Sequence, residues 1–116
     1  MIIDDKGIKN TVAIVTGGGR GIGRAIVDRL RGDGAIVVTC GRSERPRDLH
    51  DDVIWVQADV SKTSDAKRIF EEAAKVGQVC VLVNNAGIQL EKTVRDTSDD
   101  DWSLIIAVNC KGVFNM

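Results

Sequence analysis

Short runs of consecutive apolar residues alternate along the chain with segments in which apolar residues recur at the spacing of a helix. The runs predict four strands, at residues 11–16, 35–40, 53–57 and 79–84. The helical spacing predicts three helices, which begin at residues 22, 65 and 98. Because strands that are apolar on consecutive positions are buried on both faces, the alternation indicates an α/β fold with a doubly wound parallel sheet.

Capping and breaking residues mark the ends of the predicted helices. Gly32 and Gly34 close the first helix, and Ser98 is suited to cap the last one. Residues 99–101 place three aspartates at the positive end of that helix's dipole. No stop signal follows this last helix. We expect one domain over residues 1–116, which contains the first four strands and part of a following long helix.

Charge and composition narrow the class of protein. The chain is 43% hydrophobic with a formal net charge of only -1, and its basic and acidic residues are interleaved. No global field therefore favours nucleic acid or an anionic membrane as a partner. The apolar runs are far shorter than the roughly 20 residues that span a bilayer. The first ten residues lack the pattern of a secretory signal, so we expect a cytoplasmic protein.

The cysteines do not indicate a metal site or a disulfide. Cys40, Cys80 and Cys110 each stand alone in an apolar segment, where a buried, reduced thiol is expected. Their odd number, their wide spacing and the presence of a single histidine argue against the alternatives. We predict no metal site.

A glycine-rich turn follows the first predicted strand and reads "TGGGRGIG" at residues 16–23. It lies at the carboxyl edge of the sheet, where the next helix offers unpaired N–H groups and the positive end of its dipole to an anion. Gly17 permits a sharp exit from the strand, whereas Gly21 and Gly23 permit close approach of backbone and phosphate. The turn is not a Walker A loop, since no Gly-Lys-Ser/Thr follows. We predict a pyrophosphate site, the alternative being a tight turn without a ligand.

Four motifs occur in order at the predicted strand ends: the glycine turn, "DV" at 59–60, "NNAG" at 84–87 and "VN" at 108–109. With them the chain resembles the short-chain dehydrogenase/reductase family over essentially its whole length. The resemblance implies a Rossmann fold, bound NAD(H) or NADP(H), and hydride transfer between the nicotinamide and a small-molecule carbonyl or alcohol substrate. It also implies that the full-length protein is a homo-oligomer.

The resemblance further assigns roles to individual residues. Asp59 would accept from the adenine amino group, Val60 would pack beside the ring, and Asn84 would brace the central strands. The glycine turn would hold the phosphates through Gly17, Arg20, Gly21, Ile22 and Gly23. The "NNAG" segment would contact the nicotinamide ribose through Asn85, Ala86 and Gly87. On the residues alone, Asp59 also suits a helix cap and residues 84–87 an ordinary turn.

Asn109 interrupts the apolar face of the last predicted helix, although asparagine is a poor helix former. The resemblance makes it a catalytic residue that helps to hold a water molecule in a proton relay. The alternative is an ordinary helix asparagine that bonds to a neighbouring carbonyl.

The end of the second strand indicates which nicotinamide cofactor binds. A carboxylate there would bond the 2′-hydroxyl of NAD and repel the 2′-phosphate of NADP, but the chain has Gly41 followed by Arg42 and Ser43. Arg20 is a second basic candidate for the phosphate. Charge-assisted bonds of this kind would favour NADP(H) by roughly 30- to 1000-fold. NAD(H) is the alternative if the strand ends two residues later and presents Glu44.

The family's proton donor, a tyrosine four residues before a lysine, is not present, because the chain contains no tyrosine. We expect that pair to lie beyond Met116 and the 116 residues alone to be inactive. A non-catalytic fragment that binds a nucleotide or a partner is the alternative function. A methyltransferase with another nucleoside cofactor is less well supported, because the arginines suit a phosphate.

Overall fold

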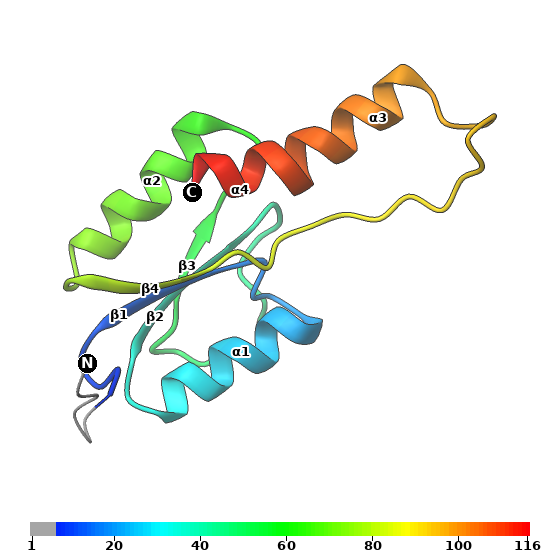
Figure 1. The fold of residues 1–116 in the computed structure, drawn as a ribbon. Coiled ribbons are helices and arrows are strands. Elements are labelled where there is room, and N and C mark those ends of the chain that lie inside the picture. The colour runs from blue at the N-terminus through cyan, green and yellow to red at the C-terminus, as the bar shows by residue number, and fades with distance from the viewer. Residues whose placement is uncertain (1–6) are drawn as a thin grey trace.

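The computed structural model describes residues 7–116 and contains a four-stranded parallel sheet with helices on both faces (Figure 1). Its strands are β1 (Val12–Thr16), β2 (Ile36–Gly41), β3 (Ile54–Gln57) and β4 (Val79–Val83). Its helices are α1 (Gly21–Gly32), α2 (Thr63–Ala74), α3 (Asp99–Ile106), the π-helix η1 (Ala107–Lys111) and α4 (Gly112–Asn115). The predicted fold class is confirmed, and the predicted strands differ from the observed ones by one residue at most at either end.

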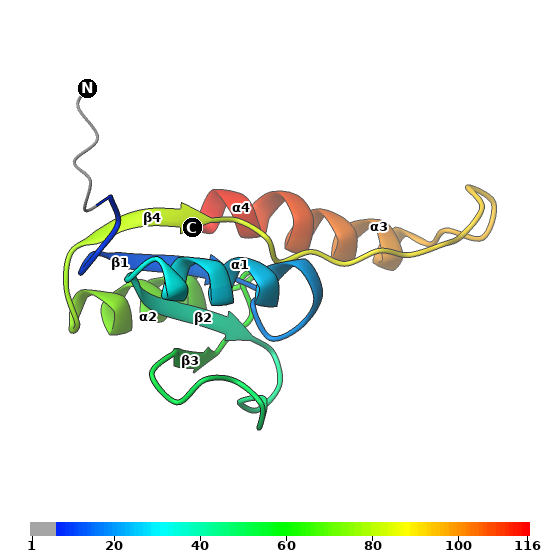
Figure 2. The same cartoon turned by 90° about the horizontal axis from the view of Figure 1, so that it is seen from below.

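The strands lie in the order β3-β2-β1-β4, which Figure 2 shows with β3 and β4 at opposite edges of the sheet. Alternate residues of the central strand β1 face opposite cores. Ala13 and Val15 pack with Val27 of α1, whereas Val12 and Ile14 pack with Ile69 of α2. Strand β1 is completely buried, as its run of consecutive apolar residues predicts.

The start of α3 follows the sequence prediction. The Ser98 Oγ accepts from the Asp101 N–H at 3.0 Å, and Asp101 Oδ2 accepts in return from the Ser98 N–H at 3.1 Å. This capping box satisfies two backbone groups that a helix leaves unpaired at that end. A hydrogen bond from Lys92 to the same carboxylate is the largest cause that keeps the pKa of Asp101 below its ordinary value.

The end of the chain departs from the predicted regular helix. Five residues, Ala107–Lys111, form a π-helix between α3 and α4, and Gly112 N donates to Ala107 O across that wider turn. Gly112 packs so closely on the segment that leads into α2 that a Cβ there would lie 2.8 Å from Val60 Cγ2. A π-helical turn inserts one residue relative to an α-helix and is frequent at functional sites.

The cysteine prediction is correct for one residue and wrong for two. Cys40 is buried in the core, whereas Cys80 and Cys110 are exposed. Cys80 belongs to the edge strand β4, whose only neighbouring strand within residues 7–116 is β1. Cys80 and Leu82 lie on the same face of β4, and both are exposed. An apolar run therefore did not reveal whether a further layer covers it.

Two sequence-based expectations concern the start of the chain and its relation to membranes. Residues 1–6, on which the absence of a secretory signal depends, lie outside the described residues. Within residues 7–116, no helix combines the length and the apolar character needed to cross a membrane.

We predict that the 116 residues, prepared alone, associate rather than stay monomeric. In the described part of the chain, strand β4 has a neighbour on one side only, and Leu82 and Phe114 are 38% and 86% exposed. An apolar strand edge with unpaired backbone groups favours pairing with another chain. Light scattering and thermal melting measure this directly, and a soluble monomer that unfolds cooperatively would refute it.

Candidate functional site

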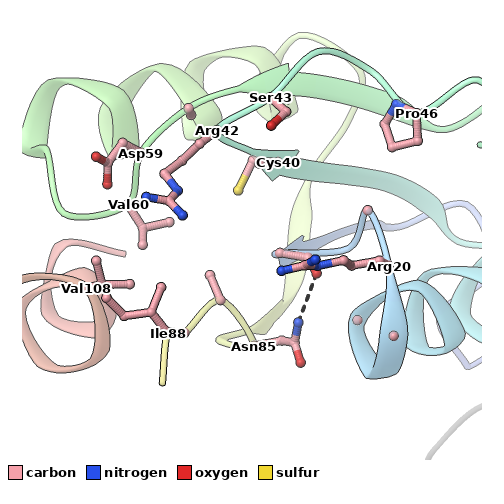
Figure 3. A pocket seen from close by; sticks show the side chains of 18 of the residues that line it. Arg20, Cys40, Arg42, Ser43, Pro46, Asp59, Val60, Asn85, Ile88 and Val108 are labelled. Atoms are coloured by element: carbon pink, nitrogen blue, oxygen red, sulfur yellow. Dashed lines mark hydrogen bonds between the residues drawn. The ribbon is translucent and has the colours of Figure 1, made fainter. Parts of the chain in front are cut away.

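A cleft of about 620 Å³ opens at the carboxyl edge of the sheet, where all four strands end (Figure 3). We call it the carboxyl-edge cleft. Every residue that the sequence assigned to the cofactor lines it: Gly17, Arg20, Gly21, Ile22, Gly23, Arg42, Ser43, Asp59, Val60, Asn85, Ala86 and Gly87. Its volume lies in the range of small-molecule and cofactor sites.

The glycine turn forms one wall of the cleft, and a side chain would clash with its surroundings at three positions of the turn: Gly17, Gly18 and Gly23. Gly17 has a φ of 68°, and a Cβ there would lie 2.9 Å from Ala86 Cα. At Gly23 a Cβ would collide with Gly17 O and with the Asn85 amide, so the glycine permits this close packing. Gly21 has open space around its Cα and is required for its φ of 58° instead.

Asn85 connects the end of β4 to the end of β1. Its Nδ2 donates to Thr16 O at 3.0 Å and to Gly17 O at 3.1 Å, and its N–H donates to Thr16 Oγ1 at 3.0 Å. The bracing of the central strands, which the sequence analysis assigned to Asn84, comes from Asn85. The two asparagines are adjacent and alternate in direction along the chain, so composition could not distinguish them.

The opposite side of the turn is held by Thr39, a fully buried residue of β2. Its Oγ1 donates to Val15 O at 2.6 Å and accepts from Gly18 N at 3.0 Å. The turn is thus fixed by Thr39 of β2 on one side and by Asn85, two residues after the end of β4, on the other. A preorganised backbone loop loses little further entropy when it binds a ligand.

The N-terminus of α1 faces the carboxyl-edge cleft without a capping side chain. Arg20 is its N-cap residue and makes no side-chain cap bond, and the first turn carries no acidic residue. By contrast, α3 carries a capping box and three aspartates in its first turn, and α2 carries Asp65. The segments η1 and α4 continue α3 without a break, so among the helices of residues 7–116 that begin after a loop, α1 alone has neither a side-chain cap nor an acid in its first turn.

Two arginines add positive charge to the same cleft. Figure 3 shows the guanidinium groups of Arg20 and Arg42 directed into it from the glycine turn and from the end of β2. Strand β2 ends at Gly41, so the strand tip carries no carboxylate. Glu44 lies three residues further and lines the cleft as part of the loop, not of the strand.

Asp59 combines a local structural role with a free acceptor. Its Oδ1 accepts from the N–H and the hydroxyl of Ser61, at 2.9 and 2.7 Å. These bonds come ahead of α2, whose N-cap residue is Lys62, so Asp59 is not the helix cap itself. The bond from the Ser61 hydroxyl is the largest cause that lowers the pKa of Asp59, against partial burial, which raises it. The carboxyl is therefore ionised at neutral pH and can only accept.

Asn109 does not line the cleft but is hydrogen-bonded to Ile88, which does. Its Oδ1 accepts from Ile88 N and its Nδ2 donates to Ile88 O, both at 2.8 Å. Asn109 lies in the π-helix η1, and its bonds go to a loop rather than to a helix carbonyl. A Cβ at Gly87 would lie 3.2 Å from its Oδ1, so this loop passes close to the helix.

The sequence analysis missed Arg24, which supports the glycine turn from outside the cleft. Its guanidinium forms a two-pronged pair with Asp48, at 3.0 and 3.2 Å, and donates to Gly19 O at 3.1 Å. Bonding to Asp48 raises the pKa of Arg24, and the same pair lowers that of Asp48. The partners are 24 residues apart, and Asp48 lies in a loop of irregular structure, so no periodic pattern could have connected them.

Trp55 of β3 was also missed. Its indole lines the cleft beside Gly19 and Gly41, and its Nε1 donates to Ser43 O at 3.3 Å. An aromatic residue in a strand predicts core packing by default. Only the approach of β3 to the end of β2 brings the ring to the cleft.

Comparisons with known proteins agree with this geometry. The model of the short chain dehydrogenase family matches residues 11–116. The NADP-dependent (R)-specific alcohol dehydrogenase of Lentilactobacillus kefiri is 38% identical over 115 residues, which cover 92% of this chain and 46% of that protein. The (3R)-3-hydroxyacyl-CoA dehydrogenase of Rattus norvegicus is 37% identical over an alignment of 131 positions, which covers 92% of this chain and 48% of that protein.

A solved structure gives the same picture. The crystal structure of 3-ketoacyl-(acyl-carrier-protein) reductase from Brucella melitensis, complexed with NADH, matches with a TM-score of 0.87 and 33% identity. The match covers 94% of this chain and 48% of that one. The chain thus spans about half the length of the curated relatives it matches. Sequence, fold and the glycine turn at the head of α1 agree, and the chain belongs to the short-chain dehydrogenase family.

Proposed function

We propose that this chain supplies the cofactor-binding half of an NADP(H)-dependent oxidoreductase that acts on a small-molecule carbonyl or alcohol. The observation that carries the proposal is the uncapped N-terminus of α1 with Arg20 and Arg42 directed into one cleft, in the absence of a carboxylate at the tip of β2. The cofactors named for two of the similar proteins differ, one protein being NADP-dependent and the other complexed with NADH. The choice therefore rests on this chain's own residues.

The residues present fit a dinucleotide. The glycine turn and the first turn of α1 offer backbone N–H groups to a pyrophosphate, and Arg20 and Arg42 offer charge-assisted bonds to a 2′-phosphate. Asp59 offers its carboxylate to an adenine amino group, with Val60 as the apolar neighbour. Residues 85–87 form the wall beyond the turn, where the nicotinamide ribose would lie. When bound, the nicotinamide supplies or accepts the hydride.

The tyrosine that donates the proton to the substrate oxygen in this family has no counterpart in these 116 residues, which contain no tyrosine. By the same proposal, the family's tyrosine and lysine follow Met116, and the residues up to Met116 alone show no reductase activity. Reading the coding sequence past that point tests this. A downstream Tyr-x-x-x-Lys supports the enzyme, whereas its absence would favour the alternative of a non-catalytic nucleotide-binding fragment.

We predict that the protein expressed in full from its own gene binds NADPH roughly 30- to 1000-fold more tightly than NADH, because two arginines can pair with the 2′-phosphate. Arg42→Asp should reverse the preference, since a carboxylate there repels that phosphate. Fluorescence titration of both cofactors at one ionic strength measures it.

A charge-matched control is Arg47→Asp, because Arg47 is exposed in the same loop and does not line the cleft. It should leave the ratio of the two affinities nearly unchanged. Equal binding of NADH and NADPH by the unmodified protein would contradict the cofactor assignment.

We further propose that Asn109 helps to hold a water molecule of a proton relay, and that its two bonds to the main chain of Ile88 fix it at the edge of the cleft. In the full protein, Asn109→Ala is expected to lower kcat by ~100- to 10,000-fold, the range of general acid–base assistance, and to change cofactor affinity much less. Steady-state kinetics and cofactor titration separate the two effects. Cys110→Ala, at the exposed neighbouring position, is the control. An unchanged kcat would reduce Asn109 to a structural residue.

A further inference from the structure

The indole of Trp55 occupies the space beside the tip of β2. A Cβ at Gly41 would lie 2.6 Å from Trp55 Cη2 and 2.9 Å from Cζ2, closer than such atoms approach in proteins. A Cβ at Gly19 would lie 3.1 Å from the same Cη2. The ring is therefore wedged between the last residue of β2 and the glycine turn, and both neighbours are glycines.

The backbone gives Trp55 little freedom to move away from Gly41. Its strand pairs with β2 in register, with Trp55 opposite Thr39 and Gln57 opposite Gly41. The indole Nε1 donates to Ser43 O, in the loop that carries Arg42. The ring is half-buried and packs on the core that α1 covers, so a side chain at position 41 cannot displace it into solvent without the loss of these contacts.

Gly41 is also the last residue of β2 and therefore forms the tip of the second strand. In sheets of this kind, an acidic side chain at the tip of the second strand bonds the ribose 2′-hydroxyl of NAD. Any acidic side chain has a Cβ, and the Cβ alone meets the indole. The tip of β2 thus has no acid, and the packing of the indole leaves no space for one.

We infer that Trp55 is a specificity-determining residue, whose indole excludes a carboxylate from position 41 and thereby closes the NAD-type ribose site. The inference rests on the proposed function in one respect, namely that the ribose 2′ position lies at this corner of the carboxyl-edge cleft. A substitution at position 41 alone therefore cannot place a carboxylate beside the ribose 2′-hydroxyl of NAD. Such a carboxylate also needs a smaller side chain at position 55.

The test is a cycle of four proteins, each expressed at full length: the unmodified protein, Gly41→Asp, Trp55→Leu and the double variant. Calorimetry gives the NADH dissociation constant of each at one ionic strength. Gly41→Asp alone, with the indole in place, is expected not to improve NADH binding. In the Trp55→Leu background the same change is expected to tighten NADH binding by about 10-fold, the effect of one charge-assisted hydrogen bond.

The outcome that overturns the inference is additivity. If Gly41→Asp tightens NADH binding equally in both backgrounds, the two positions are not coupled and Trp55 is only a core residue. If the unmodified protein binds NADH as tightly as NADPH, the cofactor assignment fails, but the coupling between positions 41 and 55 is still decided by the cycle.

A second cycle covers the case in which Gly41→Asp does not fold. Gly41→Ala is expected to lower Tm by several degrees when Trp55 is present and to have little effect in the Trp55→Leu background, because only the first protein contains the clash. Gly32→Ala, a glycine with open space around it and a negative φ, is the control and should not lower Tm. Equal losses at position 41 in both backgrounds would refute the inference.

Discussion

The end of β1 lies so close to the end of β4 and to the first turn of α1 that no side chain fits between them. Gly17 meets Ala86 on one side, and Gly23 meets both Gly17 O and the Asn85 amide on the other. Asn85 fixes this contact with hydrogen bonds to Thr16 O and Gly17 O. The close approach aims the start of α1 at the carboxyl edge of the sheet and places the glycine turn as a wall of the cleft.

The electrostatics of the site follow from the same arrangement. A helix end that satisfies itself, as α3 does through Ser98 and Asp101, has no need of an external anion. The corresponding end of α1 lacks both the cap and the acids, and it stands beside Arg20 and Arg42. A phosphate there would accept hydrogen bonds from the backbone N–H groups that the first turn of α1 leaves unpaired. The chain thus combines a rigid backbone turn with an uncapped helix end and two arginines at one cleft, although its overall net charge is only -1.

The sequence was sufficient for whatever depends on local pattern. Consecutive apolar residues located the strands, and the glycine turn located the cleft, because parallel strands present their carboxyl ends at one edge. The sequence was insufficient to predict contacts between residues that lie in different elements of the fold. The Arg24–Asp48 pair, the contact of Trp55 with Gly41 and the bonds from Asn109 to Ile88 each join separate elements.

The π-helix and the exposed cysteines were missed for a different reason. A π-helical turn is defined by the carbonyl group that each backbone N–H reaches, and the apolar spacing that predicted a helix here did not indicate which one that is. Cys80 has the composition of a buried position but lies in an edge strand. Burial of a strand depends on what lies beside it, which its own residues do not encode.

The central claim is that the glycine turn and the β2 loop bind one dinucleotide, and hydrogen–deuterium exchange with and without NADPH tests it most directly. At a cofactor concentration 100 times the dissociation constant, exchange of backbone amides that require cofactor release should slow by up to about 100-fold. We expect this slowing in segments 17–24, 41–46 and 85–88, and no change in the exposed segment 91–97. Exchange at residues 17–24 that is unaffected by NADPH would contradict the account.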